Sequence, residues 1–120
     1  MIKVSFFYPN TEGSTFDSDY YCNTHAALSK QRLAPALKSF SVDYGLSSIM
    51  PDSKPPFHAV GHLLFDSIEA FYGALTPHIE ELKGDVRNYT DVEAIIQIGE
   101  VKISEVIGDV FDQQDRRPEV

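Results

Sequence analysis

The chain has 120 residues, a length typical of a single domain, and its 42% hydrophobic and 23% charged residues are ordinary for a globular protein. Its net charge of −8, without any cluster of Lys and Arg, argues against binding to nucleic acids or to anionic membrane surfaces. One cysteine cannot form an internal disulfide, and no apolar run approaches the roughly 18 residues of a membrane span. Because the start of the sequence also lacks a signal peptide, we expect a cytoplasmic protein.

The first third of the chain predicts a strand, a turn and a helix. Residues 2–8 are rich in β-branched and aromatic side chains, which favour an extended backbone. Residues 9–15 have the Pro, Asn, Gly and Ser content of a turn. A helix is expected next, because Asp17 or Ser18 suits its amino-terminal cap and Pro35 marks its end.

The middle of the chain predicts two strands and a helical segment. Apolar and polar residues alternate over residues 37–46, so we expect a second strand there. A polar, Pro-rich loop over residues 47–56 separates it from a third strand over residues 57–65. Residues 66–89 have the apolar spacing of a helix, and Pro77 is expected to divide them into two helices.

The last predicted strand covers residues 91–103, which gives the order β-α-β-β-α-β. This order is that of the ferredoxin-like fold, an α+β fold in which helices cover one face of a four-stranded antiparallel sheet. We therefore expect one domain over residues 1–103. Residues 104–120 are a polar tail, in which residues 105–111 are compatible with a short helix or an arm.

Three of the four predicted strands carry apolar residues on both faces. In the first strand Val4 and Phe7 point to opposite sides, and in the third Leu63 and Leu64 do so. A sheet with one face in water normally alternates between apolar and polar residues, and a second apolar face would exceed the patch that monomers expose. We therefore expect a C2 homodimer that packs sheet on sheet. The alternative is a monomer whose tail folds back over the sheet.

His25 is predicted on the apolar face of the first helix. At helical spacing its neighbours on this face are Tyr21, Cys22, Leu28 and Ser29. One interpretation is a buried neutral imidazole that bonds to a backbone carbonyl or a tyrosine hydroxyl. The other is a general base or hydrogen-bond donor at a pocket, because a buried imidazole stays neutral and can accept a proton.

Other polar side chains are candidates for the same pocket. His62 lies among apolar residues of the third predicted strand and needs a polar partner. It is either a structural histidine or, with His25, a wall of the pocket. His78 follows Pro77 at the expected break between two helices. The candidate substrate-binding residues are Tyr8, Tyr21, Tyr44, His78, Asn88 and Tyr89.

The sequence contains no pattern typical of a metal or nucleotide site. The sequence has no CxxC spacing, and the only histidines with HxxxH spacing are His58 and His62, on a predicted strand, so we expect no metal site. Neither GxGxxG nor GxxxxGK[ST] occurs, so neither a dinucleotide nor a P-loop site is expected, and no other cofactor is expected. Cys22 has no basic neighbour in the sequence, and we expect a small core residue rather than a nucleophile.

Three stretches carry a resemblance to a known family: YPNTEGSTFDSDYYCNTH, GHLLFDSIEAF and NYTDVEAIIQIGEV. Together they resemble the EthD-like proteins, which are named after ethyl tert-butyl ether degradation, over about residues 1–101. The resemblance implies a dimeric α+β barrel built from two ferredoxin-like subunits. It also implies kinship with small cofactor-free barrels, among them muconolactone-type isomerases, polyketide cyclases and monooxygenases that act on aromatic substrates.

These observations leave three functional hypotheses. The first is a small cofactor-independent isomerase, cyclase or monooxygenase that holds a hydrophobic molecule between sheet and helices. In it His25 is the base or an orienting group, and His62 and a tyrosine shape the polar end of the pocket. The second is a non-catalytic protein that binds a hydrophobic small molecule or assists a partner oxygenase of a degradation pathway. The third is a dimer without a pocket, in which every histidine is structural.

Overall fold

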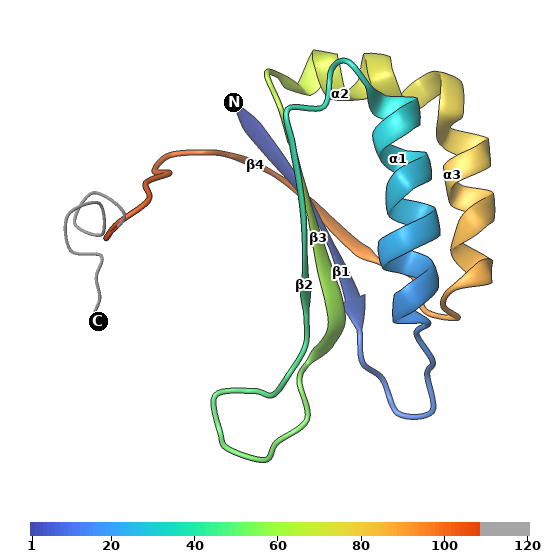
Figure 1. Cartoon of the computed structure of the whole chain (residues 1–120), viewed down its shortest axis with the longest axis vertical. Coiled ribbons are helices and arrows are strands. Elements are labelled where there is room, and N and C mark those ends of the chain that lie inside the picture. Colours follow the sequence, from blue (N-terminus) through green and yellow to red (C-terminus); the bar gives the residue numbers. More distant parts are fainter. Residues whose placement is uncertain (109–120) are drawn as a thin grey trace.

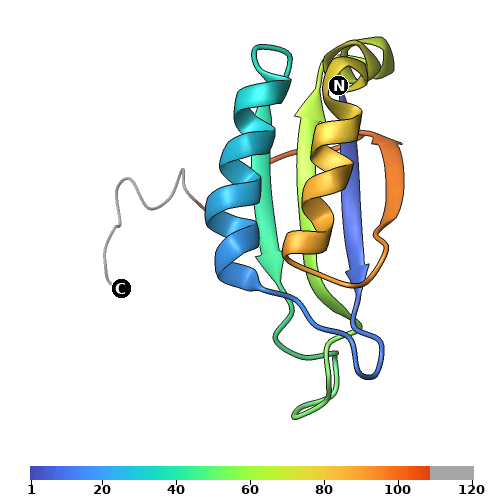
Figure 2. The same cartoon turned by 90° about the vertical axis from the view of Figure 1, so that its right-hand side faces the viewer.

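The computed structural model describes residues 1–108, which form a four-stranded antiparallel sheet with helices over one face (Figure 1, Figure 2). The strands lie in the order β2-β3-β1-β4, so the predicted ferredoxin-like α+β fold is confirmed. The strands are β1 (Ile2–Pro9), β2 (Ser39–Tyr44), β3 (Phe57–Phe65) and β4 (Ile95–Glu100). The helices are α1 (Ala26–Leu33), α2 (Ile68–Leu75) and α3 (Ile79–Asp85).

The main core lies between the sheet and the helices. Val4 of the central strand β1 is paired with Leu63 of β3 on one side and with Ile98 of β4 on the other. Each fully buried side chain of this kind stabilises the fold by roughly 1.5–3 kcal/mol, so this cluster holds the helices on the sheet. Its buried members are Val4, Leu33, Leu63, Phe65, Phe71 and Leu82.

Two strands are shorter than the sequence predicts, whereas β3 has the predicted bounds. β4 ends at Glu100 because this residue is paired with Ile2, where its partner strand β1 begins. β2 ends at Tyr44, which is paired with Ala59 of β3. Strand ends therefore depend on the partner strand as well as on local alternation of side chains.

The second helical segment begins and divides where the sequence predicts. The Ser67 hydroxyl caps α2, since it accepts a 3.1 Å hydrogen bond from the backbone N–H of Ala70. Pro77 lies in a 3-10 turn, η2 (Thr76–His78), between α2 and α3. A second 3-10 turn, η3 (Val86–Asn88), follows α3 and leads toward β4.

The first helical segment departs from the regular α-helix that the sequence predicts. Its start is capped as expected, because the Asp17 carboxylate accepts a 3.1 Å hydrogen bond from the N–H of Tyr20. The next residues form η1 (Tyr20–His25), a π-helical turn, and α1 begins only at Ala26. A π turn joins residues five apart and so changes which side chains share a face. Cys22, which we expected in the core, is exposed.

The face of the sheet without helices, here called the open face, is more polar than the sequence predicts. The strand register places Ser41, His62, Ser5 and Gln97 in one row across this face. We expected two apolar faces because we considered three strands, each by itself, and did not include β2. The residues that β2 contributes to the open face are Ser39, Ser41 and Asp43.

Apolar side chains on the open face gather in a neighbouring row. Phe7 of β1 is paired with Val60 of β3 and with Ile95 of β4, and its ring centroid lies 5.3 Å from that of Phe57. Ile95 is 57% exposed. A second sheet packed on the open face would bury this row, as the predicted homodimer requires. The homodimer itself stays a prediction.

The chain leaves the sheet on the side of the open face (Figure 1). Residues 101–108 follow β4 without regular secondary structure, and the N–H of Val101 donates to the carbonyl of Met1. Most of the predicted tail, residues 104–120, and the end of the possible helix or arm over 105–111 lie outside the described residues. Within residues 1–108, no helix combines the length and the apolar character that crossing a membrane requires.

Candidate functional site

His25 forms a close pair with an acidic residue of the second helical segment. Its Nδ1 lies 2.8 Å from Oδ2 of Asp85, the last residue of α3. The two side chains are each only 12% exposed. The chain therefore places an imidazole and a carboxylate together between the start of α1 and the end of α3, largely away from solvent.

Two further side chains hold the carboxylate of Asp85. The Tyr20 hydroxyl donates a 2.6 Å hydrogen bond to Oδ1, and Nδ2 of Asn88 donates a 3.0 Å hydrogen bond to the same oxygen. Tyr20 and His25 are five residues apart, at the two ends of the π turn η1. Residues five apart lie over one another in a π turn, so η1 directs both side chains at one carboxylate.

These hydrogen bonds keep Asp85 ionised. Burial alone would raise the pKa of this carboxyl, but the hydrogen bonds from Tyr20, His25 and Asn88 outweigh it and hold the pKa below its ordinary value. An ionised carboxylate can only accept hydrogen bonds, so the proton of a neutral His25 ring lies on Nδ1. Nε2 then carries the lone pair, and no group within residues 1–108 makes a hydrogen bond to it. This tautomer is the one that a general base needs.

Aromatic rings surround the imidazole. The ring of Tyr89 lies 4.7 Å from that of His25, centroid to centroid, and the ring of Tyr21 stacks on it at 5.7 Å with an interplanar angle of 17°. The hydroxyls of Tyr8 and Tyr89 form a hydrogen bond with each other, with 2.8 Å between the two oxygens. Burial raises the pKa of Tyr8, Tyr21 and Tyr89, so these rings stay neutral and act as walls with hydrogen-bonding tips.

Gly61 of β3 makes room for one of these rings. A side-chain carbon at this position would lie 2.5 Å from the Tyr21 hydroxyl oxygen. Only glycine therefore lets the Tyr21 ring approach the sheet this closely. The Tyr21 ring in turn stacks on His25, so the sheet supports the imidazole through one intermediate residue.

A hollow with a volume of about 330 Å³ opens next to this cluster, where η3 and the segment before η1 meet. Among its walls are Phe16, Asn88 and Tyr89, but His25 is not part of the lining. Tyr89 is shared, because it lines the hollow and packs on His25. Tyr89 is therefore the residue that links the hollow to the surroundings of the imidazole.

His62 lies on the opposite side of the sheet from His25, so the two do not share a pocket within one chain. Its neighbours Gly61 and Leu63 in β3 are buried on the helical side, and alternation therefore turns His62 to the open face. There Nδ1 lies 3.2 Å from the Ser5 hydroxyl and Nε2 lies 3.1 Å from Oδ2 of Asp43. Our expectation of one pocket with both histidines overlooked which face of β3 the helices cover.

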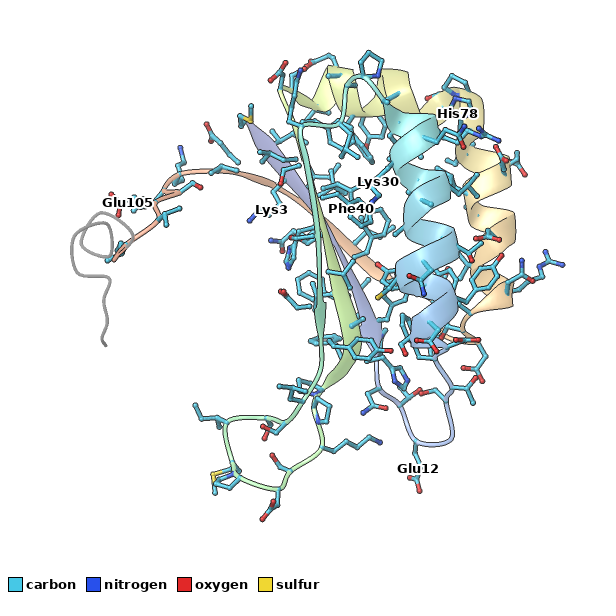
Figure 3. The ribbon with its side chains drawn as sticks, in the orientation of Figure 1. Lys3, Glu12, Lys30, Phe40, His78 and Glu105 are labelled. Carbon is cyan, nitrogen blue, oxygen red and sulfur yellow. The ribbon has the colours of Figure 1, made fainter. Side chains whose placement is uncertain are left out.

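The other candidates differ in how near they lie to His25. Tyr8, Tyr21 and Tyr89 belong to the buried aromatic cluster around His25, and Asn88 binds the carboxylate of Asp85. Tyr44 lies at the rim of that cluster, 45% exposed, with its ring centroid 6.3 Å from that of Phe16. His78 lies at the other end of the helical layer, as Figure 3 shows, and is not brought to the site.

Sequence reasoning missed two members of the site, Asp85 and Tyr20. Asp85 is 60 residues from His25, and helical spacing gives no sign of a contact at that separation. The only local signal is that Asp85 and Asn88 are three residues apart, a spacing at which helical side chains meet. Among residues 1–108, no group of three or more His, Cys, Asp or Glu side chains could hold a metal ion.

Comparisons with known proteins agree with this fold. A family model described as "EthD domain" matches residues 11–93. The chain is 40% identical to an EthD-like protein from Ralstonia eutropha JMP134, over 87% of this chain and 94% of that one, and the structures agree with a TM-score of 0.83. An EthD family protein from Bacillus halodurans C-125 is 23% identical, over 85% of this chain and 99% of that one, with a TM-score of 0.67.

A more distant likeness is one of fold alone. HapK from Hahella chejuensis is 17% identical to this chain, and the comparison covers 90% of this chain and 99% of that one with a TM-score of 0.59. No protein with a curated description matches the sequence.

Proposed function

Because this chain belongs to the EthD family, we propose that it is a small enzyme that acts without a cofactor on a hydrophobic small molecule, with His25 as its general base. An isomerisation, a cyclisation or a mono-oxygenation of an activated carbon acid or phenol can each begin with the same step. In that step a base removes a proton from the substrate. We assign this shared step to His25. The steps that follow it depend on the identity of the substrate.

The single observation that supports the proposal is the 2.8 Å contact between His25 and Asp85. Asp85 fixes the tautomer that leaves Nε2 able to accept a proton, and its negative charge lies beside the imidazolium that forms. Tyr20 and Asn88 hold the carboxylate in place through hydrogen bonds of 2.6 and 3.0 Å. A base positioned in this way contributes roughly 10²–10⁴-fold to the rate of a proton transfer.

The proton balance of the step is simple. The substrate C–H or O–H bond breaks, its electron pair stays on the substrate as an enolate or phenolate, and the proton moves to Nε2 of His25. In an isomerisation the same imidazolium returns the proton to another atom of the substrate. We place the entry of the substrate at the hollow beside Asn88 and Tyr89, because Tyr89 lines this hollow and packs on His25.

A second function, binding without turnover, is favoured by one specific observation. The hollow of about 330 Å³ is lined by Asn88 and Tyr89 but not by His25. A small molecule that stays in this hollow contacts aromatic and amide residues together with the charged residues Asp17, Arg87 and Asp91, and it does not reach the base. In this case the protein carries or sequesters its ligand for another component of a degradation pathway.

We further propose that the active unit is a C2 homodimer joined through the open face. The row of Phe7, Val60 and Ile95 supplies an apolar strip that a second sheet would bury. Light scattering coupled to size exclusion should then give twice the chain mass of 13.4 kDa. A mass of 13.4 kDa at micromolar concentration would exclude this assembly.

Deuterium exchange tests the proposed base even while the product of the reaction is unidentified. A panel of unsaturated lactones, whose acidic C–H bonds report proton removal, is first screened for binding by thermal shift. Each ligand found is then incubated with the protein in D₂O, and loss of the acidic C–H signal is followed by NMR. The wild type should catalyse the exchange and His25→Ala should not, although it still binds the ligand.

The matched control for this experiment is His78→Ala. It removes the same kind of side chain from the other end of the helical layer and should leave exchange unchanged. Equal exchange by the wild type and His25→Ala would refute the assignment of the base. Binding without any exchange by the wild type would favour the carrier function.

A further inference from the structure

The loop between β2 and β3, residues 45–56 and here called the β2–β3 loop, carries large apolar side chains into solvent. Ile49 is 97% exposed, and its neighbours Leu46 and Met50 are exposed as well. Neighbouring apolar side chains that a chain leaves in water mark an interaction surface. Figure 1 shows that the loop extends past the end of the sheet and bends away from the helices, toward the side of the open face.

Hydrogen bonds hold this loop in a defined shape. At its base the N–H of Gly45 donates to the carbonyl of His58 over 3.0 Å. At its tip the N–H of Ser53 donates to the carbonyl of Met50 over 3.2 Å, which closes a turn. An ordered backbone therefore presents the apolar tip, so binding through this tip orders little additional chain and loses little conformational entropy.

The open face has a hollow of about 280 Å³ at the opposite end of the sheet from this loop. Leu64 and Ile103 are apolar walls of the hollow, and Lys3 adds a positive charge. Lys3 is paired with Leu64 near the start of β1, whereas the loop follows the end of β2 at Tyr44. Figure 3 shows the side chain of Lys3 projecting from the sheet on the side away from the helices.

The position of the apolar row on the open face decides which parts of two copies meet. This row, Phe7 with Val60 and Ile95, lies near the end of β1, and Lys3 lies four residues earlier, about 13 Å along the strand. A two-fold axis along the row packs the rows of two copies on each other. It also places Lys3 opposite a point that lies the same distance beyond Phe7 in the other copy. Because β1 ends at Pro9, this point is past the sheet, level with the β2–β3 loop.

Charge favours this axis over an axis parallel to the strands. The parallel axis would bring the β2–β3 loop of one copy to that of the other, and Lys3 level with a second Lys3. The axis along the row instead brings Lys3 to the loop of the other copy, where Asp52 is exposed. Neither Lys3 nor Asp52 has an ion-pair partner within residues 1–108. Opposite charges that meet across an interface fix its register, whereas like charges oppose it.

We propose that in the homodimer the β2–β3 loop of each copy fills the hollow on the open face of the other. Ile49 packs against Leu64 and Ile103, and Asp52 pairs with Lys3. This inference rests on the proposed homodimer and identifies the segments that join its two copies. The hollow is thus occupied by the chain itself, and the exposed apolar tip of the loop is buried.

The dissociation constant of the dimer, measured by analytical ultracentrifugation of the full chain, tests the loop contact. Ile49→Asp should raise it at least about tenfold, because the change removes buried apolar surface and places a charge in an apolar contact. Ile68→Asp is the matched control, since it changes an exposed isoleucine of α2 on the helical side and should have no effect.

The outcomes separate the two proposals. A wild type that sediments at 13.4 kDa would refute the homodimer and the loop contact together. A wild-type dimer whose dissociation constant is the same in Ile49→Asp would refute the loop contact alone.

A double-mutant cycle tests the ion pair. Lys3→Gln and Asp52→Asn should each raise the dissociation constant about twofold to tenfold. The two changes together should raise it no more than the larger single change, because they remove the same contact. Asparagine is the replacement at position 52 because it tolerates the positive φ of 63° found there. Effects that multiply would show that the two side chains do not meet.

Cross-linking distinguishes the two axes. Cys22, the one native cysteine, is first changed to serine. In this background Ile49→Cys together with Ile103→Cys should form a covalent dimer with a short bismaleimide, and neither change alone should do so. A covalent dimer from Ile49→Cys alone would show that loop meets loop and would overturn the proposal. Absence of a covalent dimer from the double variant would contradict it as well.

Discussion

The two faces of the sheet each carry a histidine paired with an aspartate, yet the pairs differ in nearly every other respect. On the helical side His25 lies 2.8 Å from Asp85, and both side chains are 12% exposed. On the open face His62 lies 3.1 Å from Asp43, whose side chain is 73% exposed. Water screens an exposed pair and leaves it with little net energy, whereas a buried pair keeps its strength.

The two pairs also differ in the hydrogen bonding of the second ring nitrogen of the histidine. Nε2 of His25 has no hydrogen-bond partner within residues 1–108, whereas both nitrogens of His62 are occupied, one by Ser5. Asp85 is also held by two donors besides His25, whereas the Asp43 carboxylate bonds only to His62 in the described part of the chain. A histidine next to an aspartate is thus not by itself a base. Burial, a fixed carboxylate and an unoccupied nitrogen together make His25 the better candidate.

The largest expected difference between the two faces is in catalysis of proton exchange. His25→Ala should lower the exchange rate roughly 10²–10⁴-fold, because it removes the proton acceptor. His62→Ala should change the rate by less than about threefold, since it acts on the opposite side of the sheet. Both rates come from deuterium exchange of a bound ligand followed by NMR. A loss in His62→Ala as large as that in His25→Ala would show that the two faces work as one site.

The next largest difference is in stability. Asp85→Asn should lower the free energy of unfolding by about 1–3 kcal/mol, because Tyr20 and His25 lose a buried ionic acceptor. Asp43→Asn should cost less than about 1 kcal/mol, because its partner contact is exposed. Urea unfolding followed by circular dichroism gives both values. Equal losses in the two variants would contradict the comparison.

Two glycines, one in β3 and one in α2, give a smaller difference in stability. Gly61→Ala should destabilise the protein by about 1–2 kcal/mol, because its new methyl group would press on the Tyr21 hydroxyl. Tyr21→Phe in the same chain should recover part of this loss, which a double-mutant cycle measures. Gly73→Ala in α2 is the control. Its methyl group would meet nothing within 4 Å, and it should be neutral or stabilising by up to about 1 kcal/mol.

The last prediction is a dependence of stability on pH. The folded-state pKa of Asp85 lies below its ordinary value of 3.8, so folding gains stability from this group above pH 3.8 and loses it as the pH falls through the lower, folded-state pKa. The wild type and Asp85→Asn should therefore differ most near pH 6 and converge in strong acid. A difference that stays constant from pH 6 to pH 2 would show that the ionised form of Asp85 is not what stabilises the fold.

Local patterns predicted the fold well because most of its determinants are local. Alternation located the four strands, and Ser67 and Asp17 cap their segments as expected. The interior position of His25 also followed from helical spacing. The partner of His25 could not be found in this way, because the contact with Asp85 depends on the packing of α3 beside α1.

Two other features could not be predicted from the sequence, for different physical reasons. The side of His62 depends on which face of β3 the helices cover, and that choice is made by the whole topology rather than by alternation within one strand. The π turn at Tyr20–His25 has no distinctive local composition. It is stabilised by tertiary contacts, since Tyr20 and His25 both bind Asp85.

The π turn makes the orientation of the imidazole depend on the number of residues in the turn. Deleting one residue between Tyr20 and His25, such as Asn23, would let the segment relax into a continuous α-helix. Each residue of an α-helix advances the side-chain direction by about 100°, so residues four apart share a face, and the shortened helix would keep Tyr20 and the imidazole aligned. With all its residues but no π turn, the segment would instead separate Tyr20 and His25 by about 140° around the helix, and the two side chains could not both reach Asp85. The π turn therefore accommodates one extra residue without loss of the contact between histidine and aspartate.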